Sequence, residues 1–350
     1  MATEVRFDLL SSLTDVSGVP GYEDRIRDLV IDELEKATDT VEVDAMGNVV
    51  GTLEGSGDYE LIVAAHMDEI GFMVSDVNDG FLKLDPLGGW DPRILKAQRV
   101  TVHTADGDIV GVIGTPPAHT LDEEDLKKSP EISDLFVDIG MTEEAADETV
   151  SRGDLVTLDQ HLVTMGDLVT GKALDDRICV FAMIEAARRI ESPDVTIHFA
   201  ATVQEEVGLR GATALGVDID PDLAIALDVT VANDVPQIGE PADAVTELGA
   251  GTAIKLKDSS VITSPKVHGR LTDIAEAESI DHQHEVLPAG GTDTAGFQNT
   301  AGAKPVGAIS IPTRYLHTVT ETADGDDVTA TIDLLTAFLR SETGEHDYTL

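Results

Sequence analysis

Amphipathic helices and apolar strands alternate through most of this chain, but one stretch of short strands interrupts the alternation. After residue 164 a helix is predicted at 177–191 and an apolar strand at 195–203, and further helices and strands follow. This rhythm is typical of a mostly parallel sheet with helices on both faces. Residues 67–163 instead carry short alternating strands between Gly and Asp turns, as in a small β domain. We therefore predict an α/β fold in which residues 1–66 and 164–350 form one domain, with the β-rich residues 67–163 inserted into it.

Shorter segments also have distinct local patterns. Residues 7–16 and 23–37 are predicted to form helices with one apolar face, separated by a Gly/Pro breaker. Residues 40–55 are typical of a hairpin, and residues 60–66 of a strand buried on both sheet faces. Within the β-rich part, residues 116–134 are charged, bounded by prolines and poor in apolar side chains, so we expect a long mobile loop there.

The chain is strongly acidic over its whole length. It has 350 residues, of which 67 are acidic and 23 are basic, and its formal net charge is −44. Repulsion between such charges is screened beyond roughly 3 Å at about 1 M salt. We therefore expect a protein of a halophilic cytoplasm, with a merely acidic enzyme as the alternative. The same charge argues against nucleic acid or an anionic membrane as a partner.

Cysteine content and hydropathy bear on the cellular location. Cys179 is the only cysteine, so an intrachain disulfide is impossible, and its apolar surroundings predict an inert core position. The chain has neither a basic and apolar leader nor a run of about 18 apolar residues. We expect no signal peptide, no membrane span and a cytoplasmic location.

Side chains that commonly bind metals occur at the ends of the predicted strands. In open α/β sheets, ligands bind beyond the carboxyl ends of the strands. The side chains in question are His66, Asp68, Asp175, Asp176, Glu205, Glu206, Asp228 and His317. Singly, each has an ordinary explanation as a buried histidine, a capping aspartate or a solvated glutamate. Together they favour a pair of divalent cations, because adjacent unpaired carboxylates would repel each other at low dielectric.

Two further segments are candidates for contacts with a substrate. The segment AGGTDTAG at 289–296 offers Gly291 for close backbone approach and Asp293 for a cationic group, with an ordinary Gly-rich turn as the alternative. His119 lies in the PPAHT segment, which either enters the active chamber of a neighbouring subunit or forms a plain surface loop. The sequence patterns leave both alternatives open at each segment.

Six ordered motifs carry a resemblance to a known family. They are AAHMDEIGFMV, GKALDDR, QEEVGLRGA, ALDV, AGGTDTAGFQ and SIPTRYLHTVTE. Over nearly the whole chain they resemble the two-metal aminopeptidases of the TET (tetrahedral) family, with its deblocking and glutamyl aminopeptidase relatives. The resemblance implies a zinc-peptidase-like α/β fold with an inserted β-rich dimerisation domain.

The resemblance also implies a set of metal ligands. His66 and Asp228 would bind one divalent ion, Glu206 and His317 would bind the other, and Asp175 would bridge the two. Mixed histidine and carboxylate ligation suits several metals, of which we expect zinc or cobalt.

The neighbouring carboxylates take other roles in the same resemblance. Asp68 would orient the His66 imidazole, Asp176 would follow a strained or cis peptide, and Glu205 would be the general base. Because successive side chains of a strand point to opposite sides, we expect Glu205 to reach the attacking water while its neighbour Glu206 holds metal.

The implied activity is removal of the N-terminal residue from short peptides by a metal-activated water, with Glu205 moving the proton. A glycoside hydrolase of the endoglucanase type would also use paired carboxylates, but one Trp and four Tyr are few for stacking sugars. A non-catalytic metal-binding assembly protein would not need Glu205. Assays of amino-acid p-nitroanilides with and without chelator, in molar salt, would separate the three.

Self-association is implied by the resemblance alone. The family forms dimers through the inserted domain, and these assemble into a tetrahedral homododecamer with its active sites facing inward. The preferred N-terminal residue of the substrate is not indicated by the sequence.

Overall fold

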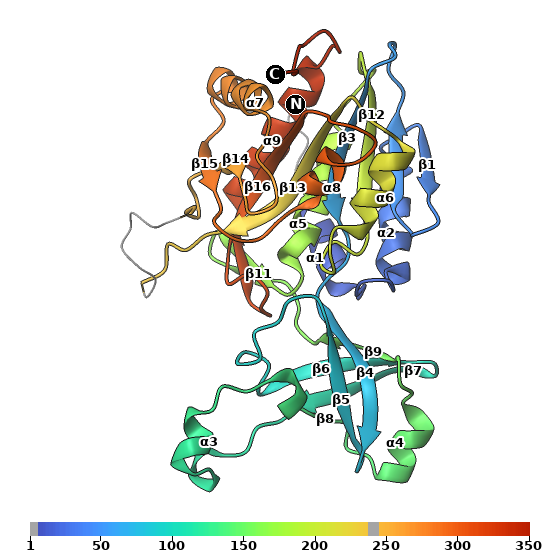
Figure 1. Ribbon diagram of the computed structural model, residues 1–350, viewed down its shortest axis with the longest axis vertical. Helices are drawn as coiled ribbons and strands as arrows, with labels where there is room; N and C mark the ends of the chain where they lie inside the picture. The colour runs from blue at the N-terminus through green and yellow to red at the C-terminus, as the bar shows by residue number, and fades with distance from the viewer. Residues whose placement is uncertain (1–5, 237–244) are drawn as a thin grey trace.

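A computed structural model describes residues 6–236 and 245–350 of the chain. They form an α/β part and a β-barrel, which lie at opposite ends of an elongated molecule and are joined by a narrow connection (Figure 1). The barrel strands fall between residues 71 and 158, and the strands of the large sheet come before and after them in the chain. This architecture confirms the predicted fold class.

The α/β part is built on an 11-stranded sheet. Its strands are β1 (Thr40–Val43), β2 (Val49–Leu53), β3 (Glu60–His66), β10 (Val163–Met165), β11 (Leu168–Gly171), β12 (Thr196–Thr202), β13 (Leu223–Val231), β14 (Thr252–Lys257), β15 (His282–Val286), β16 (Val306–Arg314) and β17 (Glu321–Asp324). The central strands run in the order β12, β3, β13, β16, and all neighbours among them are parallel, as predicted. Towards both sides, β1, β2, β17, β11 and β10 extend the sheet through antiparallel pairs. The centre of the sheet is therefore parallel, and β14 and β15 form a further parallel pair that joins β16 through an antiparallel contact of β14.

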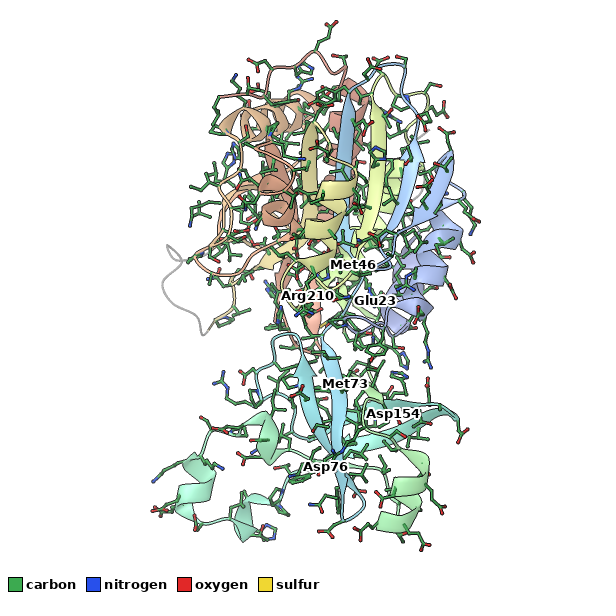
Figure 2. The ribbon with its side chains drawn as sticks, turned by 45° about the vertical axis from the view of Figure 1, so that its right-hand side comes forward. Glu23, Met46, Met73, Asp76, Asp154 and Arg210 are labelled. Atoms are coloured by element: carbon green, nitrogen blue, oxygen red, sulfur yellow. The ribbon has the colours of Figure 1, made fainter. Side chains whose placement is uncertain are left out.

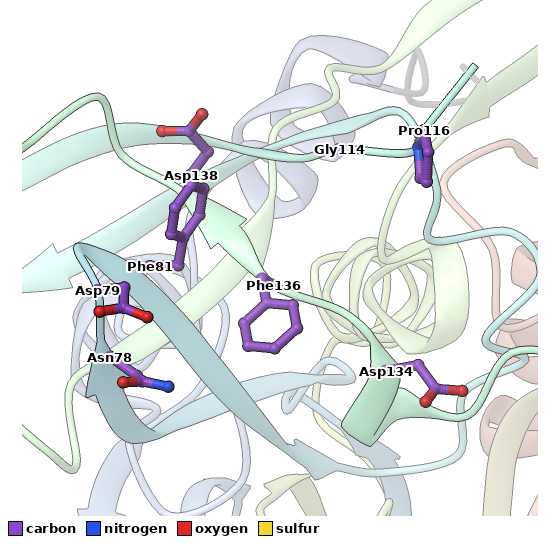
Figure 3. Close-up of a pocket in the computed structure, with 8 residues that line it drawn as sticks. All are labelled: Asn78, Asp79, Phe81, Gly114, Pro116, Asp134, Phe136 and Asp138. Carbon is purple, nitrogen blue, oxygen red and sulfur yellow. The ribbon is translucent and has the colours of Figure 1, made fainter. Parts of the chain in front are cut away.

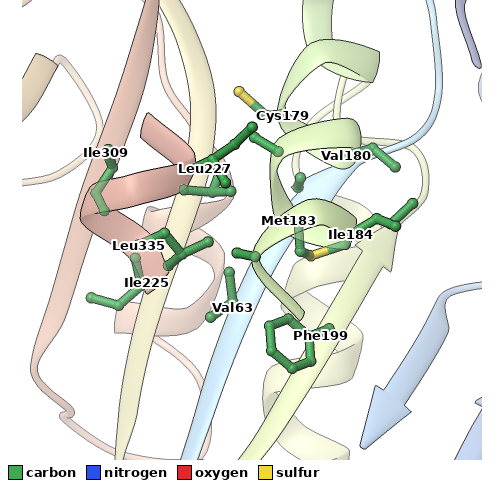
Figure 4. Close-up of a cluster of buried hydrophobic side chains, with 14 of the residues drawn as sticks. Val63, Cys179, Val180, Met183, Ile184, Phe199, Ile225, Leu227, Ile309 and Leu335 are labelled. Carbon is green, nitrogen blue, oxygen red and sulfur yellow. The ribbon is translucent and has the colours of Figure 1, made fainter. Parts of the chain in front are cut away.

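Helices cover both faces of this sheet. They are α1 (Phe7–Asp15), α2 (Asp24–Leu34), α5 (Leu174–Ala187), α6 (Arg210–Asp218), α7 (Pro265–Glu278), α8 (Asp293–Gln298) and α9 (Gly325–Ser341). Because side chains alternate along a strand, Leu61 and Val63 of β3 pack with α5 and α9, whereas Ile62 and Ala64 pack with α6 and α8 on the opposite face. Helix α5 is buried along its whole length, and Cys179 is a core residue of this helix, as expected (Figure 4).

The β-rich part is a closed barrel with the strand order β4, β5, β8, β7, β6, β9. The strands are β4 (Gly71–Asn78), β5 (Phe81–Leu87), β6 (Gln98–Thr104), β7 (Gly107–Ile113), β8 (Val137–Asp138) and β9 (Leu155–Leu158). Buried apolar side chains such as Phe72, Val100 and Val156 form its core. Closure pairs every strand with two neighbours and leaves no free edge. Helix α4 (Glu143–Thr149) follows β8, and the Thr142 hydroxyl accepts a backbone N–H at its start.

Residues 116–134, for which a long mobile loop was expected, contain short helical elements. They contain 3-10 turns at Ala118–Thr120 and Ile132–Asp134, and helix α3 (Glu123–Lys127) lies between them. The prediction missed α3 because this segment has too few apolar residues to show a helical period. Local hydrogen bonds stabilise it instead, including one from the Glu124 N–H to the Asp122 carboxylate at 2.9 Å.

A cavity of about 520 Å³ opens on the barrel (Figure 3). It is lined by Asn78, Asp79, Phe81, Gly114, Pro116, Asp134, Phe136 and Asp138. The Lys83 ammonium lies 5.7 Å from the centroid of the Phe136 ring. The lining contains none of the strand-end ligand candidates, so this cavity is separate from the site described below.

An ion pair helps to join the barrel to the α/β part. Arg25 of α2 contacts Asp108 of β7 at 2.8 Å, and Asp108 also lies 2.9 Å from the His103 ring. Figure 2 labels Glu23 and Arg210 at the end of the α/β part that faces the barrel. Across the described residues, no helix combines the length and the apolar character needed to cross a bilayer.

Candidate active site

The strand-end candidates meet at one edge of the central sheet. His66 is the last residue of β3 and pairs in register with Thr202, the last residue of β12. Glu205 and Glu206 follow β12, and Asp228 lies in β13, which pairs with β3 on the side away from β12. Residues far apart in sequence converge here because parallel strands share one carboxyl edge.

The Asp175 carboxylate lies between two imidazoles. Its Oδ1 is 3.1 Å from His66 Nε2, and its Oδ2 is 3.4 Å from His317 Nε2. On either side, Glu205 Oε2 lies 3.9 Å from His66 Nε2, and Glu206 Oε2 lies 3.8 Å from His317 Nε2. One carboxylate thus faces two different histidines, each of which has a glutamate beside it.

These contacts set the charges of the two histidines. Burial opposes the charged form of His66, but hydrogen bonds to Asp175 and Asp68 raise its pKa well above the usual value. Burial also opposes the charge on His317, yet Asp175 and Glu206 raise its pKa to about 10. In return, hydrogen bonds from both histidines outweigh burial and hold the pKa of Asp175 below its usual range. Asp175 thus favours the protonated form of both imidazoles, and the imidazoles favour the charged form of Asp175.

The other carboxylates are buried with too little positive charge around them. Burial raises the pKa of Glu206 to about 7, and the charge of Asp175 adds to this effect. Burial likewise raises the pKa of Glu205 and of Asp228 well above their usual values. Removing carboxylates from water is unfavourable unless a cation or a proton neutralises them.

This donor set fits divalent cations. His66, Asp176 and Asp228 offer ligand atoms that lie within 4.8 Å of one another, and so do His66, Asp175 and Glu206. Imidazole nitrogens and carboxylate oxygens are the donors that zinc and similar ions bind. The first group contains Asp176. From the resemblance, we expected Asp176 only to follow the peptide bond that presents Asp175 to the cations.

Asp175 and Asp176 are joined by a cis peptide bond, as the resemblance implied. The Asp176 Oδ2 accepts the backbone N–H of His66 at 3.2 Å. Its Oδ1 is buried and has no hydrogen-bond partner among the described residues. A buried carboxylate oxygen without a partner beside Asp228 is a further sign that this site accommodates a cation.

Asp68 connects the first histidine to both glutamates. Its Oδ1 accepts the Glu205 N–H at 3.0 Å, and its Oδ2 accepts the Glu206 N–H at 3.2 Å. The same Oδ1 lies 3.5 Å from His66 Nδ1, and the Asp68 carbonyl oxygen lies 3.2 Å from that nitrogen. Asp68 therefore contacts the His66 imidazole and also holds the backbone that presents Glu205 and Glu206.

The argument from strand alternation at the two glutamates is wrong. Strand β12 ends at Thr202, and Gln204 adopts a left-handed conformation with φ of 55°. Glu205 and Glu206 therefore lie in a turn, where side chains do not alternate between two sheet faces. The hydrogen bonds to Asp68 hold this turn in place.

Glu321 is a residue of the site that the sequence reasoning missed. It is buried at the start of β17, and its two oxygens accept the backbone N–H groups of Asp175 and His317 at 3.0 and 2.9 Å. It is the last residue of the motif SIPTRYLHTVTE, so its proximity to His317 was the available signal. One carboxylate thus fixes the backbone at two of the candidate ligands.

A loop from the barrel part reaches the site. The Gly89 carbonyl accepts the His317 Nδ1–H at 2.7 Å, which leaves Nε2 free to face Asp175. Gly88 has φ of 93°, a conformation that L side chains rarely adopt, and an added Cβ there would lie 2.4 Å from Ile70. The site is therefore completed by both parts of the molecule.

The substrate candidates have different positions in the structure. Asp293 is buried at the start of α8, accepts a hydrogen bond from the Thr202 hydroxyl, and has a pKa raised to about 6 by burial. Gly291 is exposed just before α8, where an added Cβ would lie 2.9 Å from the Ser260 hydroxyl. His119 is exposed on a 3-10 turn of the barrel part, and the structure does not bring it to the site within one chain. The structure therefore brings Asp293 to the strand-end cluster and leaves His119 apart from it.

Comparison with known proteins identifies the family. Residues 47–334 match the family described as M42 glutamyl aminopeptidase. This chain belongs to the M42 family. The lysyl aminopeptidase of Pyrococcus furiosus is 36% identical over 342 residues, which cover 96% of this chain and 97% of the relative.

Solved structures extend the likeness of this M42 protein to the whole fold. The aminopeptidase APDkam598 from the archaeon Desulfurococcus kamchatkensis matches with a TM-score of 0.92 and 38% identity, covering 97% of this chain and 95% of that chain. The TET1 peptidase of Pyrococcus horikoshii matches with a TM-score of 0.87 and 34% identity, covering 96% and 99%. The predicted family is confirmed, and the M42 protein is a metal-dependent aminopeptidase.

Proposed function

We propose that the site holds two divalent cations, zinc or cobalt, and removes the N-terminal residue from short peptides. His66 and Asp228 would hold one cation, Glu206 and His317 would hold the other, and Asp175 would be shared between the two. The observation that carries this proposal is the position of Asp175, whose two oxygens face His66 and His317 separately. A bridging carboxylate needs this arrangement, with one oxygen directed to each metal position.

Glu205 is the residue placed to move the proton in this reaction. When bound, the cations polarise the scissile carbonyl and favour ionisation of water near neutral pH. The Glu205 carboxyl is close to His66, and its backbone is held by Asp68. Burial raises its pKa, which makes it a stronger base for accepting a proton and then returning that proton to the leaving amine.

Asp293 supplies negative charge for the protonated amino terminus of the peptide. Its Oδ1 is buried and has no hydrogen-bond partner among the described residues, while Oδ2 is held by Thr202. Recognition of a free amino group by a fixed carboxylate would restrict cleavage to the first peptide bond. The exposed Gly291 leaves room for the substrate backbone beside α8.

Assembly completes the proposal. The TET1 peptidase of Pyrococcus horikoshii can assemble into a tetrahedron or a large octahedral shell. We infer that this chain forms dimers through its barrel and a tetrahedral dodecamer from those dimers. In such a particle, His119 of one subunit can contact the active site of another subunit only where the two subunits meet.

Substitution of the two adjacent glutamates tests the assigned roles. Glu205→Gln should keep both metals and lose roughly 10²-fold to 10⁴-fold in turnover, because the near-isosteric amide cannot take a proton. Glu206→Ala should instead lower metal occupancy and turnover together. Elemental analysis and p-nitroanilide kinetics measure both quantities, with the exposed Glu276→Gln as the control. A Glu205→Gln variant without metal, beside a fully loaded Glu206→Ala variant, would reverse the roles.

The same preparations discriminate between the alternative activities. A peptidase cleaves amino-acid p-nitroanilides and loses this activity with chelator, whereas a glycoside hydrolase releases reducing ends from a β-glucan. A metal-binding assembly protein would do neither, and Glu205→Gln would then change nothing that can be measured. Activity on β-glucan that Glu205→Gln abolishes, without peptidase activity, would overturn the proposal.

A further inference from the structure

Three histidines lie together on the outer side of the α/β part, apart from the site described above. His268 belongs to α7, and His282 and His284 belong to β15. The ring centroids of His268 and His284 are 5.1 Å apart, and those of His282 and His284 are 5.8 Å apart. Figure 1 shows α7 and β15 at an outer edge of the α/β part, whereas His66 ends a central strand.

The fold places these three rings together for a simple reason. His282 and His284 are two residues apart on a strand, so their side chains point to the same face. Strand β15 is joined to the sheet through β14. Helix α7 also packs on β14, and its first turns bring His268 to the rings of β15. The spacing of the three rings therefore follows from the way α7 and β15 lie against β14.

Each ring keeps a nitrogen that can serve as a ligand. The His282 Nδ1 lies 3.0 Å from the Ile280 carbonyl oxygen, and this contact orients the ring with Nε2 available. The His268 Nε2 is buried and has no hydrogen-bond partner among the described residues. His284 is exposed. A buried imidazole nitrogen without a partner, next to two other imidazoles, is unfavourable unless something binds it.

We propose that His268, His282 and His284 form a second metal site, which binds one divalent cation of the Zn²⁺, Cu²⁺ or Ni²⁺ type. Zinc–nitrogen distances of about 2.0–2.1 Å place the centroids of two tetrahedral imidazole ligands about 5 Å apart. The observed separations of 5.1 and 5.8 Å are close to this value. Rotation of the rings completes the site, because the three rings do not yet place three nitrogens within 4.8 Å of one another in the described structure.

The surroundings favour a cation that prefers imidazole. Burial lowers the pKa of His268, and the neighbouring His284 and His282 lower it further, so its ring is neutral and able to bind metal. Three imidazoles suit zinc, copper and nickel, whereas magnesium and calcium prefer oxygen ligands. The site therefore differs in its selectivity from the acidic surface, which attracts any cation.

Zinc binding by purified, full-length protein tests this inference. Samples are equilibrated with Zn²⁺ in about 1 M NaCl, which screens non-specific attraction to surface carboxylates, and zinc per chain is measured after desalting. His284→Ala should hold about one zinc ion per chain less than the wild type, or bind it more than about 10-fold more weakly, because it loses a direct ligand. Peptidase activity should be unchanged, since His284 is outside the proposed active site.

Matched variants separate this site from the first. His161→Ala removes an exposed histidine that pairs with Asp15 instead of with other histidines, and it should bind zinc as the wild type does. Glu206→Ala should keep its retention on immobilised Ni²⁺, whereas His284→Ala should lose it. Equal zinc content and equal retention for the wild type, His284→Ala and His282→Ala would overturn the inference.

Discussion

Glu321 shows how one side chain can fix the backbone of two proposed metal ligands at once. Its two oxygens accept the backbone N–H groups of Asp175 and His317, which we propose as the bridging ligand and a ligand of one metal. Both oxygens must be acceptors for this arrangement. A carboxylate meets that requirement, but an amide has only one oxygen.

Replacement of Glu321 by Gln should therefore leave one of these two N–H groups without an acceptor and loosen the ligand that carries it. We expect metal affinity to fall by about 10-fold to 100-fold, the usual effect of removing a group that orients metal ligands. Turnover at saturating metal should fall less than it does in Glu205→Gln. Metal titrations and kinetics measure the two effects, with Glu276→Gln as the control. If Glu321→Gln bound metal as tightly as the wild type, Glu321 would have no positioning role.

Metal binding should also release protons, because the pKa values of several proposed ligands are raised. The pKa of Glu206 is raised to about 7 and that of His317 to about 10. At pH 7 His317 must lose its proton to bind, and about half of the Glu206 carboxyls must do so. Apparent affinity should therefore rise as the pH increases from 6 towards 10.

Calorimetry in two buffers of different ionisation enthalpy measures this release directly. We expect more than about one proton per cation site at pH 7, and a smaller number for His317→Gln. Binding without any buffer dependence at pH 7 would contradict the assignment of His317 and Glu206 as ligands.

At the residue scale, the sequence allowed prediction of the side chains that converge but not of the contacts that hold them. His66, Asp228 and the two glutamates stand at the ends of apolar runs, and this pattern is visible in the sequence. The contacts from Asp68 and Glu321 go to backbone N–H groups, whose directions depend on turns that the sequence does not reveal. Gln204 is the clearest case, because its left-handed backbone conformation places both glutamates in a turn after the strand.

At the scale of elements, the loop around Trp90 couples the barrel to the active site. The Trp90 indole N–H donates to the Gly71 carbonyl at 3.1 Å, and its ring stacks on Phe72 with centroids 5.0 Å apart. The preceding Gly89 carbonyl accepts the His317 hydrogen bond. Trp90 therefore anchors the loop that orients one of the proposed ligands.

Two substitutions at Trp90 should separate the effect of its hydrogen bond from the effect of its stacking on Phe72. Trp90→Phe keeps an aromatic ring and loses one hydrogen bond, so the free energy of unfolding should fall by about 0.5–1.5 kcal/mol with little change in turnover. Trp90→Ala also loses the stacking, and turnover should fall by about 10-fold because His317 loses its support. Urea unfolding and p-nitroanilide kinetics measure these effects. Full activity in Trp90→Ala would show that the loop does not orient His317.

Buried apolar elements were easier to predict from the sequence than polar or short elements. Strands β3 and β12 are continuous apolar runs, and they were predicted to within a residue of their ends. Strand β15 (His282–Val286) is polar, and helix α8 (Asp293–Gln298) is short and contains glycine, so neither has the pattern on which such predictions depend. Tertiary packing beside buried neighbours, not local propensity, explains why these segments are ordered.

At the scale of the whole molecule, function depends on how the barrel contacts the α/β part. In the sequence, the two parts are distinguished only by a change in strand pattern. The resemblance suggested that the β-rich part serves dimerisation. The structure adds that its loop contacts His317, so the barrel also bears on the geometry of the site. A change in how barrels pair in an assembly could therefore alter activity without any substitution near the metals.

The net charge of −44 leads to the last prediction, that assembly and activity require high salt. Charges are screened beyond about 10 Å at 0.1 M salt but beyond about 3 Å at 1 M. Close packing of acidic subunits should therefore fail at low ionic strength, and size-exclusion mass and turnover should both fall between about 3 M and 0.1 M salt. Sucrose is the control, because it favours burial without screening charge. A large, active particle in sucrose at 0.1 M salt would show that hydration, not repulsion, sets the salt requirement.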